Sequence, residues 1–285
     1  AGEVGPAFID DALAKLTTIF DQTHGGFGGA PKFPPSPIFP FLFGCDDRAR
    51  GRDGQYMSMV TLDRMADGGI HDQIGGGFHR YAVDGHWLVP HFEKMLYDNA
   101  LLVPAYLEAY WLTNRARYAE VARETLDYLL RDLKAPGGAF FSAEDAGEVG
   151  KEGEFYVWAE SDLREALGPD FAKFASVFPV STEGNFEHKT NVLHLTNREQ
   201  WNEARSPELT ALKAKLFMLR EKRQRPHRDT KILTAWNGLA LTAFAMGYRA
   251  LGDEKYLRAA EEAARWMREH LFRGGILLRR YCDGD

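Results

Sequence analysis

The sequence predicts an all-α fold made of stacked helical hairpins, which is the plan of an α/α toroid. Apolar residues recur at three- and four-residue spacing through most of the 285-residue chain, as in amphipathic helices. Short polar junctions alternate with longer glycine-rich ones, which indicates hairpins with short loops at one end and long loops at the other. In a toroid the long loops surround a central cavity. An irregular helical bundle is the alternative.

We expect seven helices, near residues 6–21, 56–67, 94–113, 117–133, 207–224, 235–251 and 254–272. Gly252 can adopt the left-handed conformation that ends one helix, and Asp253 can cap the next. Asn114 is placed to turn the chain between two other helices. Such tight connections make neighbouring helices antiparallel.

Residues 137–196 interrupt the helices with a predicted β insertion. Short runs of aromatic and β-branched residues at 140–142, 155–158 and 192–195 are separated by turn-forming residues. We expect them to form a small sheet that covers one end of the toroid. No linker or low-complexity tract divides the chain, so we expect one domain over residues 1–285.

Composition excludes several classes of function. The chain is 45% hydrophobic and carries a formal net charge of -6, which argues against nucleic acid as a partner. No apolar run has the length needed to cross a bilayer, so no membrane partner is expected. The two cysteines, Cys45 and Cys282, form no Cys-x-x-Cys pair, and a reducing, cytoplasmic location is the natural expectation. The chain begins with Ala1, which we interpret as a sign of processing or of a longer protein.

Chemistry is concentrated in a glycine-rich segment that leads into the helix expected at 94–113. Four of the nine histidines lie there, namely His71, His79, His86 and His91. Imidazole titrates near neutral pH, and neighbouring carboxylates supply acid–base partners. At the start of this helix, His91 and Glu93 lie at the positive end of the helix dipole, and Asp98 follows in its first turn. The alternatives are that Glu93 caps the helix and that Asp98 pairs with a neighbouring arginine.

Two later loops have a similar polar character. Glu144 and Asp145 follow a predicted strand and precede several aromatic residues, a combination typical of a sugar-binding cleft. Asp229 lies in the loop before the helix at 235–251, and Trp236 and Asn237 belong to the first turn of that helix. The histidines show no His-x-x-x-His spacing, and glycine loops make a poor rigid cage, so we expect neither a metal nor another cofactor.

Five strings in this sequence resemble a known family. They are GGFGGAPKFP at 25–34, HDQIGGGFHRY at 71–81, WLVPHFEKMLYDNA at 87–100, FSAEDA at 141–146 and KILTAWNGL at 231–239. Together they look like the helical region of the thioredoxin-domain-containing proteins related to spermatogenesis-associated protein 20. The resemblance implies an (α/α)6 barrel of the six-hairpin glycosidase type, similar to N-acylglucosamine 2-epimerases. It also implies an N-terminal thioredoxin-like domain, which we do not expect within residues 1–285. With seven helices rather than twelve, we expect a barrel truncated at both ends.

The leading hypothesis is a carbohydrate-active enzyme of the epimerase or isomerase type that acts on a sugar or sugar-like substrate, and two alternatives accompany it. In an epimerase or isomerase, two histidines would move a proton α to a sugar carbonyl. In a glycoside hydrolase, Glu93 or Asp98 would act opposite Asp145. The third hypothesis is a non-catalytic module that binds a glycan or a protein beside a redox domain. The predicted catalytic residues are His79, His91, Glu93, Asp98 and Asp145. The predicted substrate-binding residues are Arg80, Tyr81, Trp87, Glu144, Asp229, Trp236 and Asn237.

Overall fold

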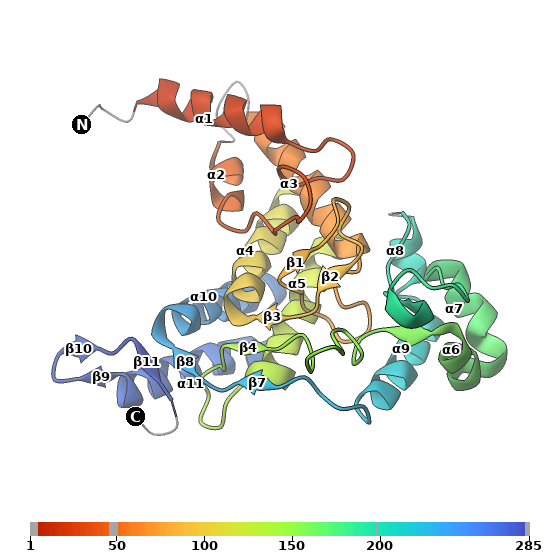
Figure 1. Cartoon of the computed structure of the whole chain (residues 1–285). Helices are drawn as coiled ribbons and strands as arrows, with labels where there is room; N and C mark the ends of the chain where they lie inside the picture. The colour runs from red at the N-terminus through yellow and green to blue at the C-terminus, as the bar shows by residue number, and fades with distance from the viewer. Residues whose placement is uncertain (1–4, 46–50, 198, 283–285) are drawn as a thin grey trace.

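Helical hairpins form the main body of the molecule. The computed structural model describes residues 5–45, 51–197 and 199–282. Helix α4 packs against both α5 and α10, and α10 packs against α11 (Figure 1). Helices α2 and α3 pack together beside α4, and α1 lies at the outer edge. The bounds of these helices are α1 (Pro6–Ile19), α2 (Phe39–Gly44), α3 (Gly51–Asp67), α4 (Leu96–Thr113), α5 (Ala116–Tyr128), α10 (Thr234–Leu251) and α11 (Glu254–His270).

The short hairpin turns have the residues that the sequence predicts for them. Asn114 ends α4 with a left-handed φ of 52°, and its N–H donates to the Tyr110 carbonyl. Gly252 ends α10 in the same way with φ 69°. The Asp253 side chain then accepts a hydrogen bond from the Lys255 N–H at the start of α11. Each pair of helices is therefore joined by only a few residues and runs antiparallel.

The long loops repeat one lysine–aspartate arrangement. Lys32 Nζ lies 2.7 Å from Asp21 and donates to a glycine carbonyl at 2.9 Å. Lys94 Nζ lies 2.9 Å from Asp72 and likewise donates to a glycine carbonyl at 2.9 Å. Both aspartates also accept hydrogen bonds from backbone N–H groups of their own loop. The weak sequence repeat is thus a structural repeat.

Two asparagines attach the glycine-rich loops to the first turns of α4 and α10. The Asn99 amide accepts from the N–H of Phe78 at 2.7 Å and donates to its carbonyl at 3.0 Å. Asn237 makes the equivalent pair of hydrogen bonds to Phe140, at 2.8 and 2.9 Å. Both asparagines are fully buried, so these bonds satisfy backbone groups that water does not reach.

Short antiparallel strands connect the long loops. Strands β3 (Lys94–Met95), β4 (Ala143–Glu144) and β7 (Arg228–Asp229) form one three-stranded sheet in that order. The remaining strands pair two by two as β1–β2, β5–β6, β8–β11 and β9–β10. Their bounds are β1 (Tyr81–Ala82), β2 (Pro90–His91), β5 (Trp158–Ala159), β6 (Thr190–Asn191), β8 (Ile232–Leu233), β9 (Phe272–Arg273), β10 (Ile276–Leu277) and β11 (Arg280–Tyr281).

The region 137–196 differs from the predicted β insertion. It contains short strands, but helices α6 (Glu160–Leu167) and α7 (Phe171–Val177) occupy its middle. Their buried residues Leu163, Leu167 and Phe174 lie at helical spacing, a period that the sequence prediction missed. With α8 (Gln200–Glu203) and α9 (Pro207–Arg220), these helices form a lobe at the side of the hairpins (Figure 1).

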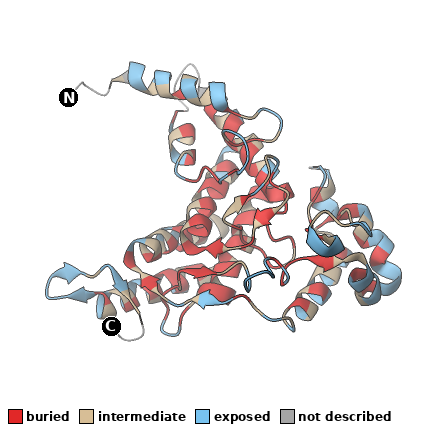
Figure 2. Ribbon diagram, viewed as in Figure 1, coloured by how far each residue is buried: buried red, intermediate tan, exposed pale blue. Residues whose placement is uncertain are grey.

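The core is continuous through the hairpins, where buried residues predominate (Figure 2). Helix α4 lies at its centre and buries residues such as Leu102, Tyr106 and Leu107 completely. The predicted helix at 117–133 continues from α5 as one π-helical turn, Leu129–Leu133. Among the residues that the structure describes, none of the helices has the length and apolar character required to span a membrane.

Candidate functional site

Three stretches that are far apart in the sequence meet in the β3–β4–β7 sheet. Lys94 pairs with Glu144, and Glu144 pairs with Arg228. Continuing this register by one residue places Glu93 opposite Asp145, and the Asp145 N–H donates to the carbonyl of His227 at 2.8 Å. Neighbouring residues on a strand point to opposite faces of a sheet. The row of Lys94 and Glu144 therefore points to the buried face, and the row of Glu93 and Asp145 points to the other.

The Arg80 cluster, defined here as Arg80, Glu93, Tyr97 and Asp98, lies at the start of α4. Tyr81 of β1 pairs with His91 of β2. This pairing brings Arg80, just before β1, close to Glu93, which follows β2. Arg80 Nη1 donates to Glu93 Oε2 at 2.8 Å, and the guanidinium also interacts with the Tyr97 hydroxyl. This arrangement holds a carboxylate and a cation together at the loop end of the hairpins.

Asp98 has the most unusual environment in this cluster. Its residue is only 8% exposed, and its Oδ2 atom has no hydrogen-bond partner. Burial raises the pKa of Asp98 to about 7; Arg80 and a hydrogen bond with the Tyr97 side chain oppose this shift, and Glu93 adds to it. Asp98 can therefore hold and release a proton near neutral pH, as a general acid must.

His91 lies between two carboxylates. Its Nδ1 is 2.7 Å from Glu152 Oε1, its Nε2 is 3.7 Å from Glu93 Oε2, and its ring stacks on Tyr81. Glu152 also accepts a hydrogen bond from the Phe92 N–H. Glu152 lies 61 positions from His91 in the sequence. Nothing in the local pattern indicates this contact.

Two predicted site residues lie away from the cluster. His79 is buried, its Nδ1 is bonded to the Phe92 carbonyl at 2.9 Å, and burial holds the pKa of its imidazole well below the usual range. Its neighbour Arg80 points the other way. Trp87 is fully buried, and its indole N–H donates to the His24 carbonyl at 2.8 Å. The structure therefore does not bring His79 and Trp87 to the Arg80 cluster.

The side chains of Glu144 and Asn237 are also engaged in contacts within the protein. The Glu144 carboxylate is buried, accepts from the Tyr128 hydroxyl at 3.0 Å and lies 3.4 Å from Arg225. Burial raises its pKa. The Asn237 amide is bonded to the backbone of Phe140, as described above. These two side chains are not free to contact a substrate.

Of the remaining predicted residues, Trp236 contacts the cluster, whereas Asp229 and Asp145 have partners outside it. Trp236 contacts Tyr97, with 4.8 Å between ring centroids. Asp229 pairs with Lys231 at 3.0 Å. Asp145 is half-buried and lies 3.3 Å from the His227 imidazole.

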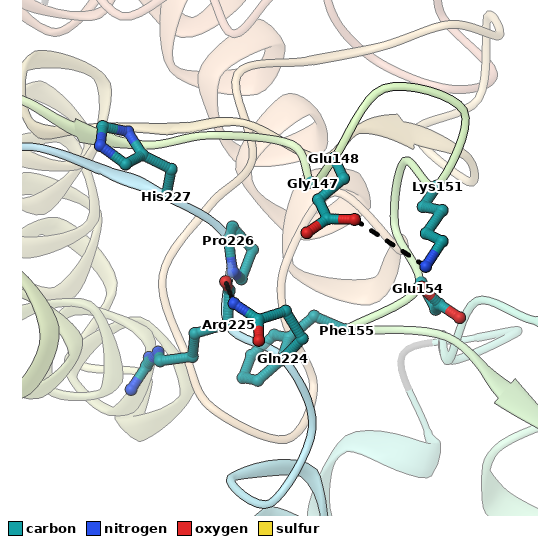
Figure 3. A pocket seen from close by; sticks show the side chains of 9 residues that line it. All are labelled: Gly147, Glu148, Lys151, Glu154, Phe155, Gln224, Arg225, Pro226 and His227. Atoms are coloured by element: carbon teal, nitrogen blue, oxygen red, sulfur yellow. Dashed lines mark hydrogen bonds and ion pairs between the residues drawn. The ribbon is translucent and has the colours of Figure 1, made fainter.

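His227 borders a recess of about 500 Å³ between the loop near residue 148 and the segment before β7 (Figure 3). The recess is lined by Gly147, Glu148, Lys151, Glu154, Phe155, Gln224, Arg225, Pro226 and His227. In Figure 3, Glu148 and Lys151 are drawn toward each other across its edge. Its polar lining suits water or a hydrophilic ligand.

A separate apolar groove of about 510 Å³ lies between α2, α4 and α10. It is lined by Ser36, by Phe39 and Phe43 of α2, by Leu101 and Pro104 of α4 and by Met246 of α10, among others. Leu101 follows Asp98 by three residues, so both lie on one face of α4. The Ser36 hydroxyl is buried without a hydrogen-bond partner. In the described ranges, no three His, Cys, Asp or Glu residues are arranged to hold a metal ion.

Comparison with known proteins identifies homologues. The chain is 37% identical over 296 residues to spermatogenesis-associated protein 20 of Mus musculus, a match that covers 90% of this chain and 37% of that protein. The human protein of the same name is 35% identical over 310 residues, with 95% and 39% covered. The predicted relation to this family is confirmed, and the chain spans less than two fifths of the length of these relatives. No family model matches the chain.

Among solved structures, a family 76 glycoside hydrolase from a bovine Bacteroides thetaiotaomicron strain is similar in fold. Its TM-score is 0.55 at 13% identity, and the match covers 96% of this chain and 45% of that enzyme. A sugar epimerase from a ruminal bacterium matches with a TM-score of 0.43 at 14% identity, over 97% of this chain and 90% of that one. The predicted α/α six-hairpin type of fold is confirmed.

Proposed function

We propose that the Arg80 cluster is the acid–base centre of a carbohydrate-active enzyme. The observation that carries this proposal is the contrast between two neighbouring carboxyl groups. Asp98 is buried with one oxygen unpartnered and a pKa of about 7, whereas Glu93 is paired with Arg80 at 2.8 Å. Two carboxyl groups in such different environments can divide the roles of acid and base.

The favoured reaction is cleavage of a glycosidic bond. Asp98 donates its proton to the leaving oxygen, and Glu93 accepts a proton from the attacking water. Asp145 faces the same side of the sheet as Glu93 and is a second acceptor for this role. Epimerisation by two histidines is less well supported, because His79 is buried and bonded to the Phe92 carbonyl.

Epimerisation or isomerisation is the second candidate, with His91 as the base. His91 is only partly buried, and Glu152 and Glu93 flank its two ring nitrogens. In this scheme Arg80 polarises the sugar carbonyl, and Asp98 returns the proton to the opposite face.

The test is a screen of wild type, Asp98→Asn and His91→Ala against aryl glycosides and reducing sugars. We expect aryl glycoside cleavage that Asp98→Asn lowers at least a hundredfold, as for loss of a general acid. Solvent deuterium incorporated into a sugar, and lost in His91→Ala, would instead support epimerisation. Glu165→Gln, at an exposed carboxylate of α6, is the matched control and should leave either rate unchanged.

Two results would contradict the proposal. If Asp98→Asn keeps the full rate, Asp98 is not the acid. If wild type binds glycans but converts none, the chain acts as a binding module, as in the third sequence hypothesis. A thioredoxin-like partner domain and a cytoplasmic location are further proposals; they come from the family resemblance and the cysteine pattern, respectively.

A further inference from the structure

We infer that the substrate contains at least two linked sugar residues, and that Phe33 binds the second residue by stacking. This inference names the substrate class of the Arg80 cluster and so rests on the proposed function. Its basis is a row of aromatic rings that leads from the surface to His91.

The row consists of Phe33, Tyr81 and His91. Phe33 stacks on Tyr81 with 4.6 Å between ring centroids and 29° between planes. Tyr81 stacks on His91 with 5.0 Å and 23°. A ligand must therefore be longer than one sugar ring to contact both Phe33 and the Glu93 carboxylate beside His91.

The Phe33 side chain is exposed, whereas the preceding residue, Lys32, is held in place by hydrogen bonds and an ion pair. The residue is 54% exposed, and Val83 beside β1 is 49% exposed. The preceding Lys32 is buried, exchanges two backbone hydrogen bonds with Ala82 at 2.8 and 2.9 Å, and is paired with Asp21. The ring is thus presented on a rigid support, which lowers the entropic cost of binding.

The internal repeat shows that this exposure is particular to the first loop. The residue that follows the equivalent lysine of the second loop, Lys94, is Met95. Met95 is only 8% exposed. An aromatic ring thus replaces an aliphatic core residue at the one of these two positions that faces solvent.

A sugar ring is the ligand that fits this surface. One face of a pyranose carries mainly C–H groups, which pack on an aromatic plane, while its hydroxyl edges stay in water or meet polar side chains. Tyr81 covers the inner face of the Phe33 ring and stacks on His91 in turn, so the outer face of Phe33 is the one open to a sugar. A purely apolar ligand would not suit the Arg80–Glu93 ion pair at the other end.

The experiment measures dissociation constants by calorimetry for cellobiose and mannobiose and for the methyl glycosides of glucose and mannose. We expect wild type to bind at least one disaccharide more tightly than its methyl glycoside. Phe33→Ala should weaken that disaccharide about tenfold, the scale of an aromatic stacking contact, and leave the methyl glycoside unchanged. Phe33→Trp should retain disaccharide binding.

Phe8→Ala is the matched control, because Phe8 is 62% exposed on α1 and lies outside the row. Circular dichroism melting shows whether Phe33→Ala folds. If that variant does not fold, Phe33→Trp tests the stacking contact instead. The inference is overturned if no disaccharide is preferred, or if Phe33→Ala leaves the preference intact. A disaccharide that binds through Phe33 but is never converted would refute the proposed catalysis while supporting the stacking of a sugar on Phe33.

Discussion

Asp98 offers a quantitative test that requires no knowledge of the substrate. Its pKa is about 7 in the folded chain, compared with an ordinary value of 3.8. Between these two pH values the folded state holds a proton that the unfolded state has released. Stability therefore falls as the pH rises through this window, by about 1.4 kcal/mol per pH unit. The difference between these two pKa values corresponds to a total loss of stability of about 4 kcal/mol across the window.

Asp98→Asn removes this dependence, because an amide cannot ionise. Urea unfolding of both proteins between pH 4 and 8 measures the difference in free energy of unfolding. We expect it to be near zero at pH 4 and to favour the asparagine variant by up to about 4 kcal/mol at pH 8. Asp11→Asn, on the exposed face of α1, should show no such trend. A difference that does not change with pH would refute the assignment of a raised pKa to Asp98.

Two further predictions concern the repeated loops. Lys94→Met removes one partner of the buried Lys94–Asp72 pair and should lower the free energy of unfolding by about 3–5 kcal/mol in urea unfolding. The control, Lys15→Met, removes one partner of an exposed lysine–aspartate pair and should lower it by at most about 1 kcal/mol. Asn237→Ala leaves two buried backbone groups of Phe140 without partners and should cost about 2–4 kcal/mol; a loss below 1 kcal/mol in the same assay would contradict that role.

Sequence periodicity was sufficient for the hairpins but not for the lobe. The turns at Asn114 and Gly252 are local features, since each depends on one residue that tolerates a left-handed conformation. Helices α6 and α7 are short and lie between turn-forming residues, so their helical period extends over few positions. The contact between His91 and Glu152 depends on a loop that folds back over a distance of 61 residues. No local pattern encodes such a contact.

The sequence predicts the candidate site as groups of adjacent residues. Along extended backbone, however, adjacent side chains point to opposite faces, so only some members of each group reach the proposed site. Arg80 and Glu93 point to the proposed site, whereas His79, next to Arg80, points into the core. The same alternation separates Asp145 from Glu144. Lys94, next to Glu93, is buried and pairs with Asp72, so the sheet that positions the proposed acid–base groups is stabilised from its opposite face. A substitution on the buried face should therefore act through stability, and one on the Glu93 face through chemistry.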